Sequence, residues 1–244
     1  APRVVVDANG GFDADGRGFG GPYGGWRTSG YGPGAGCRTS NYGSGAGYGG
    51  RGGDAHTSVW DAPGGPAYGN PFAPVMPGSG GGPYPGKWSG HGGGVVWIEA
   101  AQSVALDGIL SAVGLTTAWT ASGGGSGCGI FVCAPRFTGG AAAQMRADGG
   151  GGQVYNAGSN AAGGAGGGGR IAVALNVAPE TRERLIAGES PWVQTIESLP
   201  GFDGTTSVAV GATGPNYTGA PEHAPGVGSV VFLKGGQGSV LLLR

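Results

Sequence analysis

Glycine constrains the fold of this chain more than any other feature, because it occupies 62 of the 244 positions. This share is more than three times the roughly 7% that is usual in proteins. Many glycines stand in runs, such as 92–94, 123–125 and 166–169. They do not recur at every third position over any long stretch, so a collagen triple helix is excluded. The runs must therefore stay disordered or pack where no side chain would fit.

The rest of the composition indicates an ordered chain. Hydrophobic residues make up 39% of it, the net charge is −1, and six tryptophans and eight tyrosines are present. Disordered segments usually combine low hydrophobicity with high net charge. Charged residues account for 11%, against about 25% in ordinary soluble domains. A net charge near zero favours association, and the lack of a basic stretch predicts that nucleic acid is not a partner.

Two short sequence signatures recur along the chain, which predicts a repeat architecture. The first signature is a glycine run followed by an apolar segment typical of a β-strand. Its copies span residues 92–100, 127–134, 167–175 and 226–233. The second signature is a strand-like run that ends on Ala-x-Gly. Its copies span residues 4–10, 109–114, 144–149 and 207–214, and 239–244 resembles the start of another copy.

The spacing of the copies predicts one structural unit. Val95 and Gly114 are separated by the same 19 positions as Ile130 and Gly149, so two units are offset by 35 residues. We therefore predict an all-β fold, a glycine-rich parallel β-solenoid (β-helix) in which each strand stacks on its equivalent one coil away. A β-sandwich or jelly roll with long glycine-rich insertions is the alternative.

We treat residues 1–244 as a single glycine-rich β domain. Its largest glycine-rich excursion spans residues 11–94, and the repeat units occupy 95–244. Because glycine has no side chain, such excursions can form extended helices of the polyproline II type that lie side by side and exchange backbone hydrogen bonds. Helix is expected only at Pro179–Ile186, with a continuation to Leu199 as the alternative, and Gly188, Pro191 and Pro200 are expected to confine it to about one or two turns.

The glycine and strand motifs together resemble a known pattern. Residues 123–132 read GGGSGCGIFV, 147–152 read ADGGGG, and 163–173 read GGAGGGGRIAV. These motifs are similar to the GGGSGGSIxI and GGGGGRIAI blocks in glycine-rich, β-helix-like regions of large secreted bacterial surface proteins. A looser similarity is to the glycine-rich extracellular region of anaplastic lymphoma kinase-type receptors. The resemblance covers most of 90–235, with Cys128 and the longer 174–205 segment as departures, and it implies a fold rather than an activity.

No arrangement of reactive residues predicts catalysis. Glycoside hydrolysis needs two facing carboxylates, and the chain contains no Gly-x-Ser-x-Gly nucleophile motif. The carboxylates weighed for such a role are Glu99, Asp107, Asp148 and Asp203, all at expected corners or strand ends. Asp13 and Asp15 stand in a sequence that loosely resembles a calcium loop but lacks its final glutamate, so we expect solvated turn residues. We predict a non-enzymatic protein with no cofactor and no metal site.

The three cysteines, Cys37, Cys128 and Cys133, do not form a Cys-x-x-Cys motif. Cys128 and Cys133 are five positions apart, so on one strand their side chains would point to opposite faces. A disulfide would therefore join Cys37 to either Cys128 or Cys133 and leave the third thiol free.

Aromatic residues are the main indication of a binding function. Those in predicted loops are Trp26, Trp60, Trp88, Trp119, Trp192, Tyr23, Tyr31, Tyr42, Tyr48, Tyr68 and Tyr84. Aromatic rings can cover the glycine layer, and exposed rings can stack on sugars or contact a partner. We single out Trp26, Trp60 and Trp88 as candidate contacts to a polysaccharide or a protein partner. Asn216 begins an Asn-Tyr-Thr sequon, a possible glycosylation site in a secreted eukaryotic protein.

Apolar segments near both ends of the sequence predict self-association. The candidate interface residues are Val4, Val5, Val6, Val240, Leu241, Leu242 and Leu243. No polar cap accompanies these segments, and exposed strand edges invite pairing with another chain. We therefore predict head-to-tail assembly of identical subunits into an extracellular filament or surface layer.

The alternative function is that of a cell-surface adhesin or glycan-binding module within a larger secreted protein. Both functions place the chain outside the cell, and we expect that any signal peptide has been removed. No apolar run of about 18 residues is present, so a membrane span is not expected.

Overall fold

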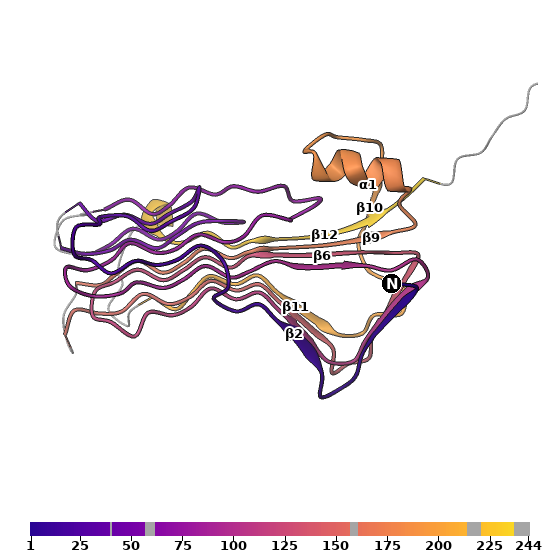
Figure 1. The fold of residues 1–244 in the computed structure, drawn as a ribbon, viewed down its shortest axis with the longest axis horizontal. Helices are drawn as coiled ribbons and strands as arrows, with labels where there is room; N and C mark the ends of the chain where they lie inside the picture. The colour runs from indigo at the N-terminus through magenta and orange to yellow at the C-terminus, as the bar shows by residue number, and fades with distance from the viewer. Residues whose placement is uncertain (40, 57–61, 157–160, 214–220, 237–244) are drawn as a thin grey trace, which may run out of the picture.

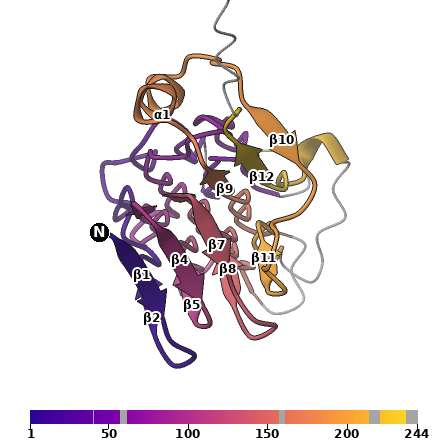
Figure 2. The same ribbon diagram turned by 90° about the vertical axis from the view of Figure 1, so that its right-hand side faces the viewer.

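In the computed structural model, strands and glycine segments occupy opposite ends of an elongated molecule (Figure 1). The structure describes residues 1–39, 41–56, 62–156, 161–213 and 221–236. The strands form a triangular end, from which the glycine segments extend as a layer (Figures 1 and 2). Trp60, Asn216 and residues 240–243, which the sequence singled out, lie outside the described residues.

Three sheets form the triangular end. The three-stranded sheet contains β1 (Arg3–Val6), β4 (Ser103–Leu106) and β7 (Arg136–Thr138). The four-stranded sheet contains β11 (Thr205–Ser207), β8 (Gln144–Arg146), β5 (Ile109–Ser111) and β2 (Gly11–Asp13). The five-stranded sheet contains β10 (Gln194–Ile196), β12 (Ser229–Lys234), β9 (Arg170–Leu175), β6 (Gly129–Ala134) and β3 (Val96–Glu99). All pairings are parallel except that of β10 with β12.

The predicted all-β solenoid is wrong as a fold class. The described residues form a mixed α/β structure, because helix α1 (Pro179–Ile186) and a short 3₁₀ helix (Pro221–His223) accompany the strands. The five-stranded sheet is also mixed, since β10 runs antiparallel to β12. Both departures from a uniform coil, α1 and β10, come from the longer segment 174–205. The alternative prediction of a β-sandwich is equally wrong, because sandwiches are built from antiparallel strands.

Local sequence accounts for the bounds of α1. Pro179 occupies the first turn, where a missing backbone N–H costs nothing. The helix ends at Ile186, and Gly188 follows with a φ of +81°, a conformation that glycine adopts without strain. The N–H of Gly188 donates to the carbonyl of Leu185 at 3.0 Å, and that of Glu189 donates to Arg184 at 2.9 Å. These bonds form a Schellman motif, so the predicted position and stop of the helix are confirmed.

Two apolar clusters hold the strands together. The first fills the triangle and includes the fully buried Leu106, Ile130 and Met145. The second lies on the outer face of the five-stranded sheet, where Phe131 and Leu185 of α1 are buried. Neighbouring side chains of one strand point to opposite faces, so β6 and β9 contribute to both clusters and are buried almost throughout. Strands buried on both faces read as continuous apolar runs, as these do.

The four copies of the first signature lie side by side in the five-stranded sheet. Val96 pairs with Ile130, Ile130 with Ile171, and Ile171 with Val230. The predicted equivalence of Val95 with Ile130 is therefore wrong by one residue. A slip of one residue would turn each side chain of a strand to the other face of the sheet. The observed register instead keeps Val96 and Ile130 in the core.

The second signature was assigned correctly in the middle of the chain and wrongly at its start. Ile109 pairs with Gln144, which agrees with the predicted offset of 35 residues. However, β1 pairs with β4, and β2 is the strand that pairs with β5. The Ala-x-Gly copy that belongs to the four-stranded sheet is thus 14–16, not 8–10.

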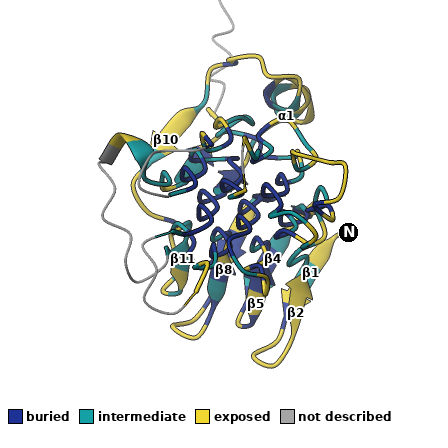
Figure 3. Ribbon diagram, turned by 90° about the vertical axis from the view of Figure 1, so that its left-hand side faces the viewer, coloured by how far each residue is buried: buried dark blue, intermediate teal, exposed yellow. Residues whose placement is uncertain are grey.

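The glycine segments are joined by backbone hydrogen bonds between chain stretches far apart in sequence. Gly124 donates to Gly164 at 3.0 Å, Gly150 to Gly125 at 2.8 Å, and Gly50 to Gly168 at 2.9 Å. Seen from their end, the segments wind as narrow helices, and those in the middle are buried (Figure 3). We call this part of the molecule the glycine layer. Its close packing leaves no space for a Cβ atom at most positions.

The three cysteines are free thiols, which corrects the expected disulfide. Cys37 contacts the carbonyl of Pro63 at 3.5 Å, and Cys128 contacts that of Met76 at 3.2 Å. Cys128 lies in the inner apolar cluster and Cys133 in the outer one, so these two side chains do face opposite sides of the sheet. Burial raises the pKa of all three thiols, that of Cys128 to about 12.

Candidate binding surface at the end of the glycine layer

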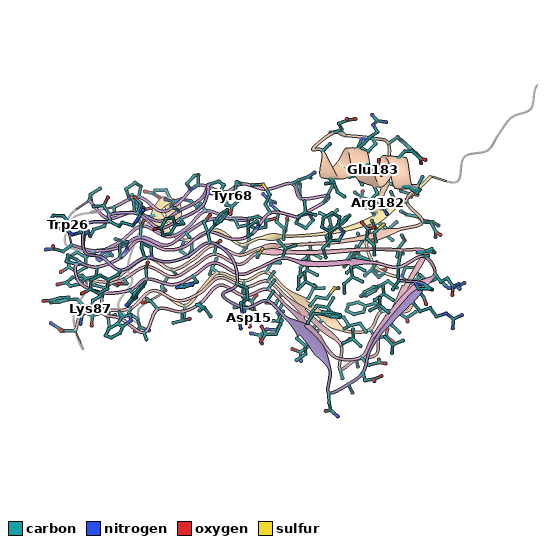
Figure 4. All side chains as sticks on the ribbon, viewed as in Figure 1. Asp15, Trp26, Tyr68, Lys87, Arg182 and Glu183 are labelled. Carbon is teal, nitrogen blue, oxygen red and sulfur yellow. The ribbon has the colours of Figure 1, made fainter. Side chains whose placement is uncertain are left out.

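Exposed aromatic residues gather at the end of the glycine layer remote from the sheets. Figure 4 shows Trp26 and Lys87 at this end. Ring contacts and hydrogen bonds connect their neighbours into one surface. We call this surface the aromatic tip; it consists of Tyr23, Trp26, Arg27, Tyr31, Lys87, Trp88 and Trp119. Its tyrosines and tryptophans are all at least 41% exposed, which is unusual for such large apolar side chains.

A tight turn presents Lys87 and Trp88 at the tip. The N–H of Lys87 donates to the carbonyl of Tyr84 at 3.1 Å across Pro85 and Gly86. Gly86 has a φ of +70°. Proline followed by a glycine with positive φ is the signature of a type II turn. The residues after the turn form a bridge with Tyr23, and Gly24 donates to the carbonyl of Lys87 at 2.8 Å.

Ring contacts fix the orientation of the exposed aromatics. The rings of Tyr23 and Trp88 lie 5.6 Å apart, and each is about half exposed. The ammonium of Lys87 lies 4.9 Å from the centre of the Trp119 ring. Aromatic pairs and cation–π contacts of this kind each contribute about 0.5–1.5 kcal/mol. The tip is therefore held in a defined arrangement although it faces solvent.

Trp26 differs from the other tip residues because its side chain is fully exposed. Its neighbour Arg27 stacks on Tyr31, with the guanidinium carbon 4.5 Å from the ring centre. Among the described residues, Arg27, Arg38 and Lys87 form no ion pair. Arg38 is tied to the same region through a bond of 3.3 Å to the carbonyl of Gly24. The tip thus combines aromatic faces with cations that no described carboxylate neutralises.

The other aromatic residues form two groups: one pair covers the glycine layer, and three tyrosines form a separate cluster. Tyr48 is fully buried and packs edge-on against Tyr68, with ring centres 4.9 Å apart. Burial raises the pKa of both phenols above their usual range. Tyr42, Tyr84 and Tyr155 form a second group of rings, with centres 5.9–6.2 Å apart. Tyr48 and Tyr68 therefore cover the glycine layer, whereas Trp26 and Trp88, two of the predicted contact residues, belong to the tip.

The acidic residues considered at the sequence level hold neighbouring segments together. Asp15 accepts bonds from the Ser111 hydroxyl at 2.6 Å and the Val113 N–H at 2.7 Å. Asp148, which follows β8 in the same sheet, repeats this arrangement: it accepts bonds from the Ser207 hydroxyl and the Ala209 N–H. These two carboxylates follow their strands at equivalent positions.

The remaining candidate carboxylates also have separate local roles and do not face one another as a catalytic pair. Asp107 accepts the N–H of Gly140 at 3.0 Å, and Asp13 accepts that of Asp15 at 2.8 Å. Asp203 is exposed. Glu99 pairs with Arg182 of α1 at 2.9 Å. Within the described ranges, no three histidine, cysteine or acidic side chains are grouped so that they could hold a metal ion.

The predicted assembly residues at the start of the chain do not share one environment. Val6 is buried in the core, Val4 is half-buried, and Val5 is 64% exposed. β1 pairs on one side with β4, and no other described strand pairs with its second side. Among the predicted assembly residues that the structure describes, Val5 and the backbone edge of β1 are therefore the parts most accessible to another chain.

Sequence reasoning missed the charged part of the tip. The sequence analysis did not single out Arg27 or Lys87, although Lys87 follows a Pro-Gly pair that marks a turn. Their positions beside Tyr31 and Trp119 depend on contacts across the glycine layer, which no local motif records.

No family model, curated protein or solved structure matches the chain. The resemblance to glycine-rich bacterial surface proteins therefore stays a prediction. In the part of the chain that the structure describes, no helix has the length and apolar character needed to cross a membrane.

Proposed function

We propose that this protein is a non-enzymatic extracellular binding module whose aromatic tip recognises an acidic polysaccharide. One observation carries the proposal: the fully exposed Trp26 belongs to the same end of the molecule as the half-exposed Tyr23 and Trp88, whose rings are held in contact with each other. Sugar rings present C–H faces that stack on indole and phenol rings. Arg27, Arg38 and Lys87 supply positive charge, which favours carboxylated or sulfated sugars.

The glycine layer suits this function because it is a stiff support. Its segments are bonded to one another along their length, and at most glycine positions their packing leaves no space for a side chain. Such a layer separates the tip from the sheets by the full length of the segments (Figure 1). A binding surface on a rigid element loses less conformational entropy when it binds.

Replacement of Trp26 by alanine should weaken binding to an acidic polysaccharide about tenfold or more, as tryptophan contacts at interfaces often do. The probes are alginate and heparin immobilised on a biosensor, with dextran as the neutral comparison. Thermal stability should not change, because Trp26 packs on nothing. Trp192→Ala is the matched control, since Trp192 is also 79% exposed but lies next to β10. Equal binding by both variants, or no binding to either acidic probe, contradicts the proposal.

A second candidate function, end-to-end assembly, is favoured by the exposed edge of β1. Val5 is 64% exposed on a strand with one unpaired side. In the five-stranded sheet, which does not contain β1, strand β10 already covers the edge of β12. Assembly would therefore rely on the exposed edges of the three-stranded and four-stranded sheets, in which β1 and β2 are end strands.

If the chain assembles, Val5→Lys should abolish filaments or higher oligomers, because a lysine on an edge strand opposes pairing with another chain. Electron microscopy and sedimentation velocity at high protein concentration measure this. Val227→Lys is the control, because Val227 is 69% exposed and lies outside the strands. A wild-type protein that stays strictly monomeric would rule out this second function.

A further inference from the structure

A groove lies between the edge strand β3 and helix α1, at the end of the molecule opposite the aromatic tip. It has a volume of about 690 Å³ and is open to solvent. Its lining consists of Trp97, Glu99, Arg182, Glu183, Ile186 and Ala187, and we call it the Trp97 groove. Figure 4 shows Arg182 and Glu183 on α1, far from Trp26.

Trp97 gives the groove an aromatic wall of fixed orientation. Val96 and Ile98 point into the core, so the alternation of the strand turns Trp97 outward. Its side chain is 47% exposed, and its ring lies 6.2 Å from that of Phe131. The indole Nε1–H donates to Oε1 of Glu99 at 3.0 Å. One face of the ring is therefore held at the groove while part of it remains accessible.

Polar groups beside the ring retain unused hydrogen-bonding capacity. Nη1 of Arg182 donates to Oε2 of Glu99 at 2.9 Å. Nη2 reaches Oε1 of Glu183 only at 4.0 Å, which is too long for a hydrogen bond. Nε of Arg182 is buried and has no partner among the described residues. Each carboxylate oxygen of Glu99 can accept a further bond, and the guanidinium can donate more than it does.

We propose that the Trp97 groove binds the ring of an uncharged sugar. The C–H face of a pyranose would stack on Trp97, while its hydroxyls would donate to Glu99 and accept from Nη2 of Arg182. The charges argue against ionic sugars. Two carboxylates around one guanidinium disfavour a uronic acid, and Arg182 in the middle of the groove disfavours an amino sugar. This site is independent of the aromatic tip, whose cations favour acidic ligands.

The Glu99–Arg182 pair also attaches α1 to β3, so a change at either residue tests two roles at once. A change of Trp97 distinguishes the two roles, because the indole makes no ion pair with the helix. A change of Trp97 alters the stacking surface and leaves the ion pair that attaches α1 in place. The Trp97→Phe variant keeps part of the aromatic face, and Trp97→Ala removes it.

The experiment follows the indole N–H signal of Trp97 in ¹H–¹⁵N spectra of the full chain. Trp97→Phe assigns this signal by its disappearance. The probes are maltohexaose, cellohexaose and mannohexaose, with glucosamine and glucuronate as charged comparisons. We expect at least one neutral hexasaccharide to shift the signal saturably, with a Kd of about 1 mM or tighter. Trp26→Ala should give the same titration as the wild type.

The variants decide whether the shift reports the proposed contacts. Trp97→Ala should abolish binding of the neutral probe, measured by calorimetry. Arg182→Lys keeps the charge and the attachment of α1 but loses the forked donor, so binding should weaken about tenfold. The melting temperature of each variant is compared with that of the wild type. A signal that no neutral hexasaccharide shifts, or that only glucosamine or glucuronate shifts, overturns the proposal, as does unchanged binding in Trp97→Ala.

Discussion

Replacement of Gly45 by alanine should destabilise the protein by about 3 kcal/mol or more. The added Cβ would lie 1.8 Å from the carbonyl oxygen of Ala165. This oxygen belongs to the backbone of a neighbouring segment of the glycine layer, so it cannot move aside as a side chain could. The segments would have to separate, and the bonds of Gly45 to Gly53 and Gly65, both 2.9 Å, would lengthen. Urea unfolding measures the change in the free energy of unfolding. For a chain of this size, the melting temperature should fall by about 6–12 °C.

Gly25→Ala is the matched control for this prediction. An added Cβ at Gly25 meets only the Tyr23 ring, at 3.6 Å, and its φ is not positive. Its free energy of unfolding should stay within about 0.5 kcal/mol of the wild type. If both variants were equally stable, the glycine layer could not be packed as closely as the structure shows.

The sequence predicted the elements of the sheets better than their assembly. The four apolar segments after glycine runs are β3, β6, β9 and β12, and they do lie side by side. Their register was missed by one residue, because corners of unequal length separate the strands. Only residues 107–108 lie between β4 and β5, whereas residues 139–143 lie between β7 and β8, and this longer corner outweighs the shorter one between β6 and β7. Counting from one signature to the next hides such differences.

The first copy of the Ala-x-Gly signature shows a second limit. Residues 8–10 and 14–16 both fit the motif in sequence. Only the second places Asp15 so that it accepts bonds from Ser111 and Val113. The equivalent bonds of Asp148 mark the same position after β8, two strands further across the four-stranded sheet. Long-range contacts of this kind decide between two local matches, and they are not visible before the fold is known.

The fold class was missed because of one insertion. The helix at Pro179–Ile186 was predicted from its proline, glycine and helix-forming residues, yet its packing on the five-stranded sheet was not. β10 contains only Gln194, Thr195 and Ile196, and it runs antiparallel to β12. A strand so short and polar has no recognisable pattern. Its place is set by the connection from α1, which returns the chain to the sheet edge.

The candidate site was predicted by residue type rather than by position. Exposed loop tryptophans were expected, and Trp26 and Trp88 do belong to the tip. Trp97 was passed over because it lies in a strand, where a large side chain usually faces the core. Strand alternation beside Val96 and Ile98 would have placed it outside. The polar partner Arg182 lies far away in sequence, so the groove itself was not predictable.

Asp54→Ala should lower the free energy of unfolding by about 3 kcal/mol or more, because it removes a buried charge that several groups share. Asp54 is 6% exposed. Its carboxylate pairs with Arg51, accepts the Gly64 N–H at 2.7 Å, and contacts Nδ1 of His223 at 2.6 Å. It therefore ties Arg51 and Gly64 of the glycine layer to His223 in the segment that leads into β12.

Two further variants distinguish loss of this connection from a general effect of removing a carboxylate. Asp54→Asn keeps one oxygen acceptor but loses the charge that pairs with Arg51, so its stability should fall between those of the wild type and Asp54→Ala. Asp203→Ala removes an exposed aspartate and should stay within about 0.5 kcal/mol of the wild type. Hydrogen exchange adds a local measurement. The N–H of Gly226, which donates to the carbonyl of Arg51 at 2.9 Å, should exchange faster in Asp54→Ala. Unchanged protection at Gly226, together with stability equal to that of Asp203→Ala, would show that the segment is held by glycine packing alone and not by the buried carboxylate.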